Sequence, residues 1–294
     1  MKAVVTVGAP ASGKSKWTKE WIAERKVLGE TWVEINRDNI RFQEVQPGGN
    51  WVTWNWGFER EVTEVADSML AMAAGCGHNV VISDTNLNEI TRLNKIATLQ
   101  KMGYEVEVKR FDVPYETLVK RDIGRDKPVG AFTIGQHHFR MAEQFGKRYV
   151  PDDSKPKAVI VDIDGTVAKM NGRGPFEWYR VGEDLPRDEV IAAVEGVAHA
   201  FGAQVLITSG RDASCREQTQ KWLYSHGIWH RELFMRPQGD MRKDTLVKEE
   251  IFWRDIEPKY NVIAAFDDRP VIVRLWHEIG IPNVFDVANP YLEF

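Results

Sequence analysis

The chain has 294 residues, of which 43% are hydrophobic and 28% are charged. This is about twice the length of a typical single domain, so we expect two domains. The composition excludes a mainly disordered chain and a small disulfide-stapled fold. Only two cysteines are present, far apart at Cys76 and Cys215, and they indicate neither a disulfide framework nor a cysteine metal site. With no long apolar run and no signal-peptide pattern, we expect a cytoplasmic protein that does not contact a membrane.

The formal net charge is −4 at neutral pH, and the acidic excess lies in the second half of the chain. Neither half is basic enough to bind a long nucleic-acid duplex through bulk electrostatics. The charge balance still permits a protein that holds only a few phosphates in a pocket.

Two short apolar runs, at residues 2–7 and 157–161, read as buried strands, and each is followed by a motif that handles phosphate. The Pro-rich polar stretch 151–156 lies between them, which predicts domains 1–150 and 151–294. Strand and helix patterns alternate in both halves, and this indicates an α/β fold with two mainly parallel sheets. The expected strands are 2–7, 31–35, 79–83, 105–111, 159–163, 204–208 and 262–266, and the expected helices are one from near residue 16, 58–74, 89–102, 188–201, 216–226 and 270–279.

Residues 8–15 read GAPASGKS and fit the phosphate-loop pattern G-x-x-x-x-G-K-[ST] in full, between a strand and a helix. Glycines let the backbone N–H groups of such a loop surround an anion, and the helix N-terminus attracts it. We predict that Lys14 reaches the β- and γ-phosphates and that Ser15 binds Mg²⁺. A coincidental turn is the alternative, and the flanking strand and helix argue against it. The predicted nucleotide-binding residues of the loop are Gly8, Ser12, Gly13, Lys14 and Ser15.

Residues 36–41 follow the strand at 31–35 and should lie at the same edge of the sheet as the phosphate loop. There Asp38 can accept the proton of a substrate hydroxyl, and Arg41 can hold an anionic substrate. A helix start that Asp38 caps explains the same residues equally well. Asp84 follows another strand and is placed for either a metal-bound water or a structural bond.

Arg121 and Arg125 are four residues apart, a spacing that places them on one helix face. Such residues are usually just solvated, but an arginine on a lid can neutralise charge during phosphoryl transfer. Three tryptophans, Trp51, Trp54 and Trp56, lie close together in the sequence. They can stack on bases, although packing in a core or an interface is the commoner use of tryptophan, so we leave them outside the predicted sites.

The second half carries a DxDGT run in which Asp162 and Asp164 directly follow a strand. One carboxylate can attack phosphorus while the other protonates the leaving group, and Gly165 lets the chain turn away. Asp267 and Asp268 end another apolar strand. Four carboxylates at neighbouring strand ends repel one another unless a hard cation lies among them, so Mg²⁺ is implied. Further residues that can hold a transferring phosphoryl group are Ser209, Arg211 and Lys248.

The order DxDGT, Ser-Gly-Arg, Lys, Asp-Asp resembles that of the haloacid-dehalogenase-like phosphatases. Together with the GAPASGKS loop, nearly the whole chain resembles the bacteriophage polynucleotide kinase/3′-phosphatase family. The resemblance implies a P-loop kinase domain followed by a Rossmann-like haloacid-dehalogenase-type phosphatase domain. Further matching segments are 36–38, 83–88, 111–114, 168–175 and 238–253.

For the first domain, the resemblance implies that Asp38 is the general base for a 5′-hydroxyl and that Arg41 contacts the acceptor's 3′-phosphate. Lys14 and Ser15 match the ligand of the ATP phosphates and the metal-side hydroxyl. Arg125 matches the lid arginine on the donor phosphates. ATP and Mg²⁺ are therefore the expected cofactors.

For the second domain, the resemblance implies that Asp162 is the nucleophile that becomes an aspartyl-phosphate. Asp164 would act as general acid and then as base. Asp162, Asp268 and the backbone carbonyl of Asp164 would hold Mg²⁺, with Asp267 in support. The residues matched to phosphate or substrate contacts are Arg173, Ser209, Arg211 and Lys248, with Asp244 supporting them.

The resemblance therefore predicts an enzyme that heals RNA or DNA ends: it adds a 5′-phosphate from ATP and removes a 3′-phosphate or 2′,3′-cyclic phosphate before a ligase acts. The host cytoplasm is the expected location if a phage encodes the chain, and the family tends to form homo-oligomers. The chain departs from the family at 51–56 and at 212–220, which leaves the acceptor preference open. One alternative is a small-metabolite kinase fused to a metabolite phosphatase. A non-catalytic end-binding protein ranks lower because every expected catalytic residue type is present.

Overall fold

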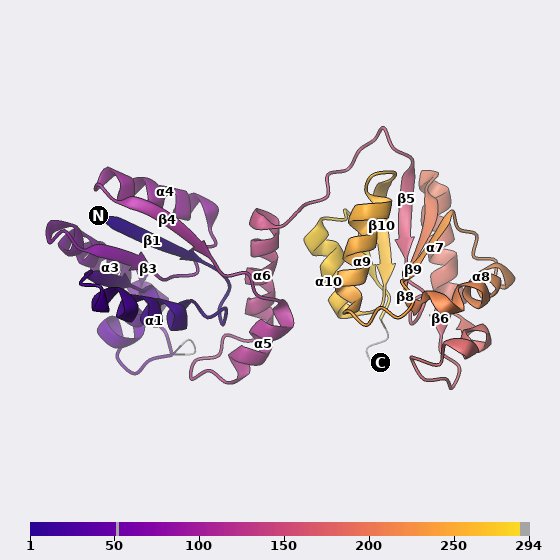
Figure 1. The fold of residues 1–294 in the computed structure, drawn as a ribbon, viewed down its shortest axis with the longest axis horizontal. Coiled ribbons are helices and arrows are strands. Elements are labelled where there is room, and N and C mark those ends of the chain that lie inside the picture. Colours follow the sequence, from indigo (N-terminus) through magenta and orange to yellow (C-terminus); the bar gives the residue numbers. More distant parts are fainter. Residues whose placement is uncertain (51–52, 289–294) are drawn as a thin grey trace. The chain divides into compact units, whose positions relative to one another are not determined.

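The computed structural model describes residues 1–50 and 53–288, and it divides the chain into two compact units, Met1–Phe145 and Gly146–Phe294 (Figure 1). Each unit contains a parallel sheet with helices packed on it. The α/β class predicted from the alternation of strands and helices is confirmed.

The sheet of the first unit has four strands in the order β2-β3-β1-β4, and all its pairings are parallel. Alternate residues of the first strand, Ala3 and Val5, join one core cluster with Val62 and Leu99 from two of the helices. The phosphate loop leaves this sheet from an interior strand. The elements are β1 (Lys2–Val7), α1 (Lys14–Val27), β2 (Trp32–Ile35), α2 (Arg37–Asn39), η1 (Ile40–Val45), η2 (Trp56–Phe58), α3 (Glu59–Gly75), β3 (Asn79–Ile82), α4 (Glu89–Lys101), β4 (Glu105–Arg110), α5 (Tyr115–Ile123) and α6 (Ala131–Phe145).

The main sheet of the second unit has five parallel strands in the order β11-β10-β5-β8-β9, and a short antiparallel pair, β6-β7, accompanies it. The strand that leads into the DxDGT run lies at its centre. The elements are β5 (Lys157–Val161), β6 (Ala168–Lys169), η3 (Trp178–Glu183), β7 (Leu185–Pro186), α7 (Asp188–Phe201), β8 (Gln204–Asp212), η4 (Ala213–Cys215), α8 (Arg216–Ser225), β9 (Glu232–Arg236), α9 (Asp244–Ile251), η5 (Phe252–Ile256), β10 (Asn261–Asp267), α10 (Pro270–Ile279) and β11 (Val284–Asp286).

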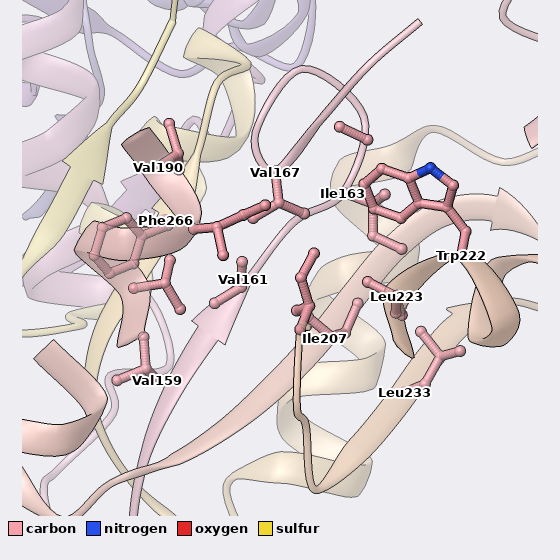
Figure 2. Packing of buried hydrophobic residues seen from close by; sticks show 14 of the residues in the cluster. Val159, Val161, Ile163, Val167, Val190, Ile207, Trp222, Leu223, Leu233 and Phe266 are labelled. Carbon is pink, nitrogen blue, oxygen red and sulfur yellow. The ribbon is translucent and has the colours of Figure 1, made fainter. Parts of the chain in front are cut away.

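Helices cover both faces of this second sheet because β5 is apolar on both sides. Val159 and Val161 belong to a cluster that includes residues of α7 and α8, such as Val190 and Leu223 (Figure 2). The intervening Ile160 belongs to a second cluster with α9 and α10. A central parallel strand buried on both faces reads as a continuous apolar run, as this one does.

The structure corrects several expected elements. The expected strand 204–208 continues to Asp212, with a shift of its register against β9 between Ser209 and Asp212. The helix carrying Arg121 ends at Ile123, so Arg125 is not on its face. The expectation that Arg121 and Arg125 share a helix face was wrong, because the chain turns at Gly124.

The tryptophan cluster lies only partly within the described residues, since Trp51 lies outside them. Trp54 is buried and packs edge-on against Phe42, with the ring centroids 5.8 Å apart, whereas Trp56 is exposed. Within the described ranges, none of the helices has the length and apolar character that crossing a membrane requires.

Candidate active sites

The phosphate loop is folded around the side chain of Lys14. Lys14 Nζ donates hydrogen bonds to the carbonyl oxygens of Gly8 (2.9 Å) and Ala9 (2.7 Å) and to Ser12 Oγ (3.2 Å). Gly13 adopts φ +96°, a conformation that favours glycine. Burial lowers the pKa of Lys14 to about 8. The loop thus places a poised cation where a phosphate would bind.

Asp38 lies beside this loop and does not cap the short helix in which it stands. Asn36 is the cap instead, because its Oδ1 accepts a hydrogen bond from Asn39 N at 2.9 Å. The capping alternative for Asp38 is therefore wrong. Asp38 Oδ1 accepts a hydrogen bond from Arg41 Nη1 at 2.7 Å. Burial raises the pKa of Asp38, and the positive charge of Arg41 partly opposes that rise.

Glu59, the first residue of α3, organises the acceptor side of this site. Its carboxylate accepts hydrogen bonds from Arg41 Nε (2.7 Å) and Nη2 (2.8 Å), from Arg37 Nη2 (3.0 Å) and from Trp54 Nε1 (3.1 Å). The hydrogen bonds from Arg41 hold the pKa of Glu59 near 2. The sequence analysis missed Glu59, because only the folded chain brings it to Arg41.

Asp84 makes structural bonds with both of its carboxylate oxygens. One accepts a hydrogen bond from Arg37 N at 2.8 Å, and the other from Lys95 Nζ at 3.2 Å. The sequence analysis left open either a metal-bound water or a structural bond for Asp84. The structure shows structural bonds, and the residue also lines the adjacent pocket.

Arg125 stands on the loop after α5 and is tied to Asp122 by an ion pair of 3.0 Å. Asp122 also accepts hydrogen bonds from the backbone N–H groups of Val129 (3.0 Å) and Gly130 (2.9 Å), so one buried carboxylate shapes this loop. Residues of this loop line the same pocket as the phosphate loop.

A pocket of about 900 Å³ joins these groups, a volume suited to a nucleotide-sized ligand. A smaller pocket of about 470 Å³ shares Ser15, Asp38 and Arg125 with it. Among the predicted site residues, the larger pocket is lined by Ser12, Gly13, Lys14, Ser15, Asp38, Arg41 and Arg125. The structure therefore brings the predicted residues of the first domain together around this pocket, apart from Gly8, which is not among the lining residues and whose carbonyl oxygen accepts a hydrogen bond from Lys14.

In the second unit, Asp162 directly follows β5 and is held by a buried lysine. Lys248 Nζ donates to Asp162 Oδ1 (2.7 Å) and to Asp267 Oδ2 (2.8 Å). Burial raises the pKa of Asp162 well above its ordinary value, and the charge of Lys248 opposes this rise. Lys248 therefore favours the ionised form that a nucleophile requires.

Asp162, Asp267 and Asp268 bring carboxylate oxygens within 4.8 Å of one another. Such a set of oxygen ligands suits a hard divalent cation. Burial and the nearby charge of Asp267 raise the pKa of Asp268 to about 6, and the positive charge of Lys248 opposes this rise only in part. Gly165 is required beside them, because its φ is +84° and a Cβ there would overlap the Asp268 carboxylate.

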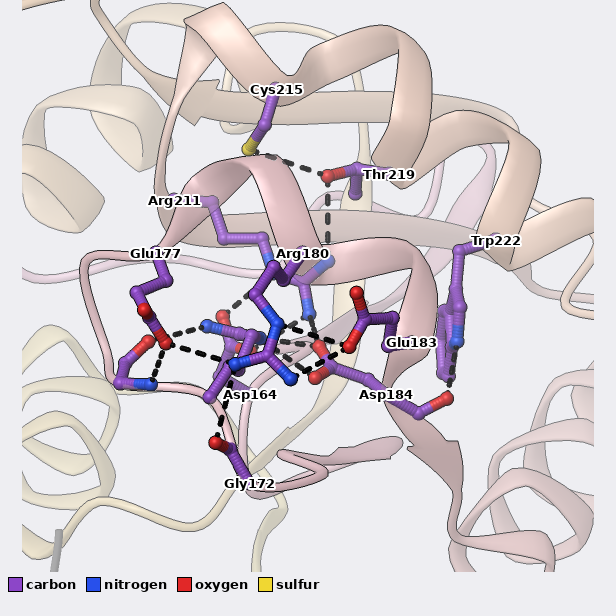
Figure 3. Close-up of polar contacts among 12 residues, drawn as sticks. Asp164, Gly172, Glu177, Arg180, Glu183, Asp184, Arg211, Cys215, Thr219 and Trp222 are labelled. Carbon is purple, nitrogen blue, oxygen red and sulfur yellow. Dashed lines mark hydrogen bonds and ion pairs between the residues drawn. The ribbon is translucent and has the colours of Figure 1, made fainter.

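The Asp164 carboxylate lies in a network of arginines that includes Arg211 (Figure 3). It accepts hydrogen bonds from Arg173 Nη2 (2.6 Å) and from Arg211 Nε and Nη2 (2.8 Å each). Although burial opposes the change, these bonds hold the pKa of Asp164 below its ordinary value. The Asp164 carboxylate is thus outside the candidate metal-binding trio, and its predicted metal contact is through the backbone carbonyl.

The sequence analysis also missed Asp184, which binds the same two arginines. It accepts hydrogen bonds from Arg173 Nε and Nη2 and from Arg211 Nη2, each at 2.7 Å. All three side chains are fully buried. No local pattern marks Asp184, because its partners Arg173 and Arg211 lie 11 and 27 residues away in the sequence.

Ser209 lies in β8, and Asp244 is the first residue of α9. Ser209 is buried, and its Oγ accepts a hydrogen bond from Arg211 N at 3.2 Å. Asp244 binds Arg269 at 2.8 Å and Arg236 at 3.3 Å and lies tightly against the backbone of β8. The supporting role of Asp244 stays a prediction.

The geometry of the two units defines a class: a P-loop phosphotransferase joined to a phosphatase built on a DxD pair. Residues 156–291 match the family model of the polynucleotide kinase PNKP phosphatase domain, and residues 4–145 match an AAA domain model. Residues 156–291 therefore belong to the family of polynucleotide kinase phosphatase domains, and residues 4–145 belong to the AAA domains. Domains of these two kinds use ATP and a divalent metal, in agreement with the phosphate loop and the carboxylate trio.

The chain is 36% identical over 312 residues to a bifunctional polynucleotide kinase/RNA ligase of Autographa californica nuclear polyhedrosis virus. That alignment covers 99% of this chain and 43% of the relative, so the chain spans less than half of the relative's length. Two solved structures are also similar. A chain of the Pnkp1/Rnl/Hen1 RNA repair complex is 29% identical, covers 97% of this chain and 96% of its own length, and has a TM-score of 0.44. A chain of another Pnkp1/Rnl/Hen1 complex is 30% identical, with coverages of 100% and 97% and a TM-score of 0.46.

Proposed function

We propose that this protein heals nucleic-acid ends. In this proposal, residues 1–150 transfer the γ-phosphate of ATP to a 5′-hydroxyl, and residues 151–294 remove a 3′-phosphate or a 2′,3′-cyclic phosphate. The observation that carries it is the presence of two separate phosphate-handling sites in one chain, of which the second lies in a polynucleotide kinase phosphatase domain. The two activities together convert an end that cannot be ligated into one that can.

In the kinase reaction, Asp38 takes the proton of the 5′-hydroxyl as its oxygen attacks the γ-phosphorus of ATP. Arg41, which the structure holds against Asp38 and Glu59, binds the acceptor's 3′-phosphate. Lys14 exchanges its carbonyl partners for the donor phosphates, and Arg125 adds positive charge from the loop after α5. Ser15 is the residue that would hold Mg²⁺ on these phosphates.

In the phosphatase reaction, an oxygen of Asp162 bonds to phosphorus as the bond from phosphorus to the 3′-oxygen breaks, and Asp164 gives that oxygen its proton. Asp164 then takes a proton from the water that releases inorganic phosphate and restores Asp162. Arg173, Arg211 and Ser209 hold the phosphate oxygens, and Lys248 favours the ionised form of Asp162. When bound by Asp162, Asp268 and the Asp164 carbonyl, Mg²⁺ would neutralise charge on the phosphoryl group.

A downstream RNA or DNA ligase is the proposed consumer of the healed ends. This is supported by the viral relative, whose name joins polynucleotide kinase with RNA ligase in one longer protein. A location in the host cytoplasm and assembly into homo-oligomers are part of the same proposal. No contact in the described residues favours the alternative of a small-metabolite kinase and phosphatase.

The test uses one oligonucleotide that carries both a 5′-hydroxyl and a 3′-phosphate, incubated with γ-labelled ATP and Mg²⁺. We expect a labelled 5′-phosphate and a free 3′-hydroxyl. RNA, single-stranded DNA and recessed duplex ends, compared in one assay, rank the substrates. Absence of label transfer to oligonucleotides of every length and type would contradict the proposed kinase function.

A further inference from the structure

Trp56 is an exposed aromatic residue in the wall of the kinase pocket. Its relative exposure is 67%, and it lines the same pocket of about 900 Å³ as Lys14, Asp38 and Arg41. An indole offers a broad flat surface, which is the kind of surface on which proteins stack the bases of single strands.

The backbone around Trp56 is fixed by its neighbours. Trp54 is buried against Phe42 and donates its indole N–H to Glu59 at 3.1 Å. On the other side, Asn55 Oδ1 accepts a hydrogen bond from Gly57 N at 3.0 Å and caps the short helix that begins at Trp56. The exposed ring is therefore presented from a defined position on the backbone.

The same contacts connect Trp56 with the acceptor side of the pocket. Glu59 binds both Trp54 and Arg41, and Arg41 in turn binds Asp38. The proposed function assigns the 5′-hydroxyl to Asp38 and the 3′-phosphate to Arg41. These two contacts fix both ends of the acceptor's terminal sugar, so its base must lie against a neighbouring part of the wall.

We propose that Trp56 stacks on the terminal base of the acceptor strand and thereby sets the kinase's affinity for nucleic-acid ends. This inference rests on the proposed kinase function. Stacking requires no particular base, because every base has a flat π-face. The kinase should therefore accept any terminal base and bind poorly to a sugar phosphate that lacks one.

The test combines variants of the full chain with two acceptors, a normal 5′-hydroxyl oligonucleotide and one whose terminal nucleotide is abasic. In the wild type, we expect loss of the base to lower kcat/KM roughly 5- to 150-fold, mainly through KM. Trp56→Leu should cause a similar loss with the normal acceptor and almost none with the abasic one, whereas Trp56→Phe should retain most of the activity. Trp229→Ala is the matched control, because Trp229 is 74% exposed and lies in the other unit.

Several results would overturn the inference. The first is unchanged kinetics in Trp56→Leu. The second is that the substitution and the abasic end each lower kcat/KM and that the two factors multiply, as they would for independent effects. The third is a raised KM for ATP with an unchanged KM for the acceptor. Retained 3′-phosphatase activity shows that the variant chain is folded, and Trp56→Phe decides the matter if the leucine variant does not fold. A wild type that labels no polynucleotide end contradicts the proposed function itself, and this is seen before any variant is made.

Discussion

Asp38 and Asp164 are both proposed to transfer protons, yet their surroundings move their pKa values in opposite directions. Burial raises that of Asp38, whereas two arginines hold that of Asp164 low despite its burial. A pair of acids tuned apart in this way suits two different reactions in one chain. Asp38 acts as a base and is ionised at the start of its reaction. Asp164 acts first as an acid and must hold a proton, and the negative charge of the substrate would raise its pKa and so help it to keep that proton.

The raised pKa of Asp38 predicts the pH dependence of the kinase. A base acts when ionised, so kcat should fall as the pH drops through a pKa above the ordinary aspartate value of 3.8. Asp38→Asn should lower kcat by roughly 10²- to 10⁴-fold and remove this acidic limb. The measurement is the pH profile of 5′-labelling at saturating ATP, with exposed Asp67→Asn as the control. An asparagine variant that keeps both the rate and the limb would show that another group is the base.

Asp184 predicts a coupled loss of stability and activity. Asp184→Asn leaves buried Arg173 and Arg211 short of one negative charge, and breaking a buried ion pair in this way typically costs about 3–5 kcal/mol. We expect a lower melting temperature and weak 3′-phosphatase activity, with 5′-kinase activity retained. Its neighbour provides the control: Glu183→Gln removes an exposed ion pair with Arg180 and should change little. Wild-type melting of the Asp184 variant would refute this account.

At the scale of elements, the strands that lead into the motifs could be predicted because their signal is local. Runs such as 158–161 are apolar throughout, and the following motif marks where they end. Strand β9 (Glu232–Arg236) was missed, since its alternation of side chains is short and flanked by charges. Glu59 and Asp184 could not be predicted at all, because their roles are set by partners that only folding brings near. The candidate site residues that belong to recognisable motifs were therefore predictable, whereas Glu59 and Asp184, which bind the arginines of the two sites, were not.

The turn after β5 gives a prediction about one glycine. Gly165→Ala should abolish phosphatase activity, because the new Cβ would overlap the Asp268 carboxylate while the backbone also has to keep φ +84°. Kinase activity should remain. Gly202→Ala is the control, because Gly202 also has a positive φ, of +60°, but no atom lies within 4 Å of its Cβ position. This substitution should lower the free energy of unfolding by about 1–2 kcal/mol and leave both activities unchanged. The 3′-phosphatase assay decides, and an active Gly165→Ala enzyme would contradict the structural account of the turn.

At the scale of the whole molecule, the acidic net charge agrees with a nucleic-acid substrate once the sites are located. Part of the acidic excess in the second half is the Asp162, Asp267 and Asp268 trio, which faces Lys248 and a prospective cation. An enzyme that works on ends needs only a few cations close to the reacting phosphates, and the proposed function assigns such positions to Lys14, Arg41, Arg173 and Arg211. Long-range attraction is not required.

The two compact units also predict that the activities can be separated. Asp162→Asn should lose the phosphatase and keep the kinase, and Lys14→Ala should do the reverse. Mixed together, the two variants should process both ends of one oligonucleotide, because each supplies what the other lacks. The product is checked by its mobility and by its ability to be ligated. Loss of both activities in Asp162→Asn would mean that the units depend on each other.

In each unit, the strand that carries the chemistry is flanked on both sides by hydrogen-bonded neighbours: β1 lies between β3 and β4, and β5 between β10 and β8. Of the outermost strands, β4, β9 and β11 carry none of the predicted site residues and can be lengthened or joined to new segments without moving the central ones, whereas β2 leads directly to Asp38. Inserted or fused sequence is therefore tolerated best at those margins, where it can alter which ends are admitted. Evolution and protein engineering can thus change the substrate range of such an enzyme while its phosphate chemistry stays the same.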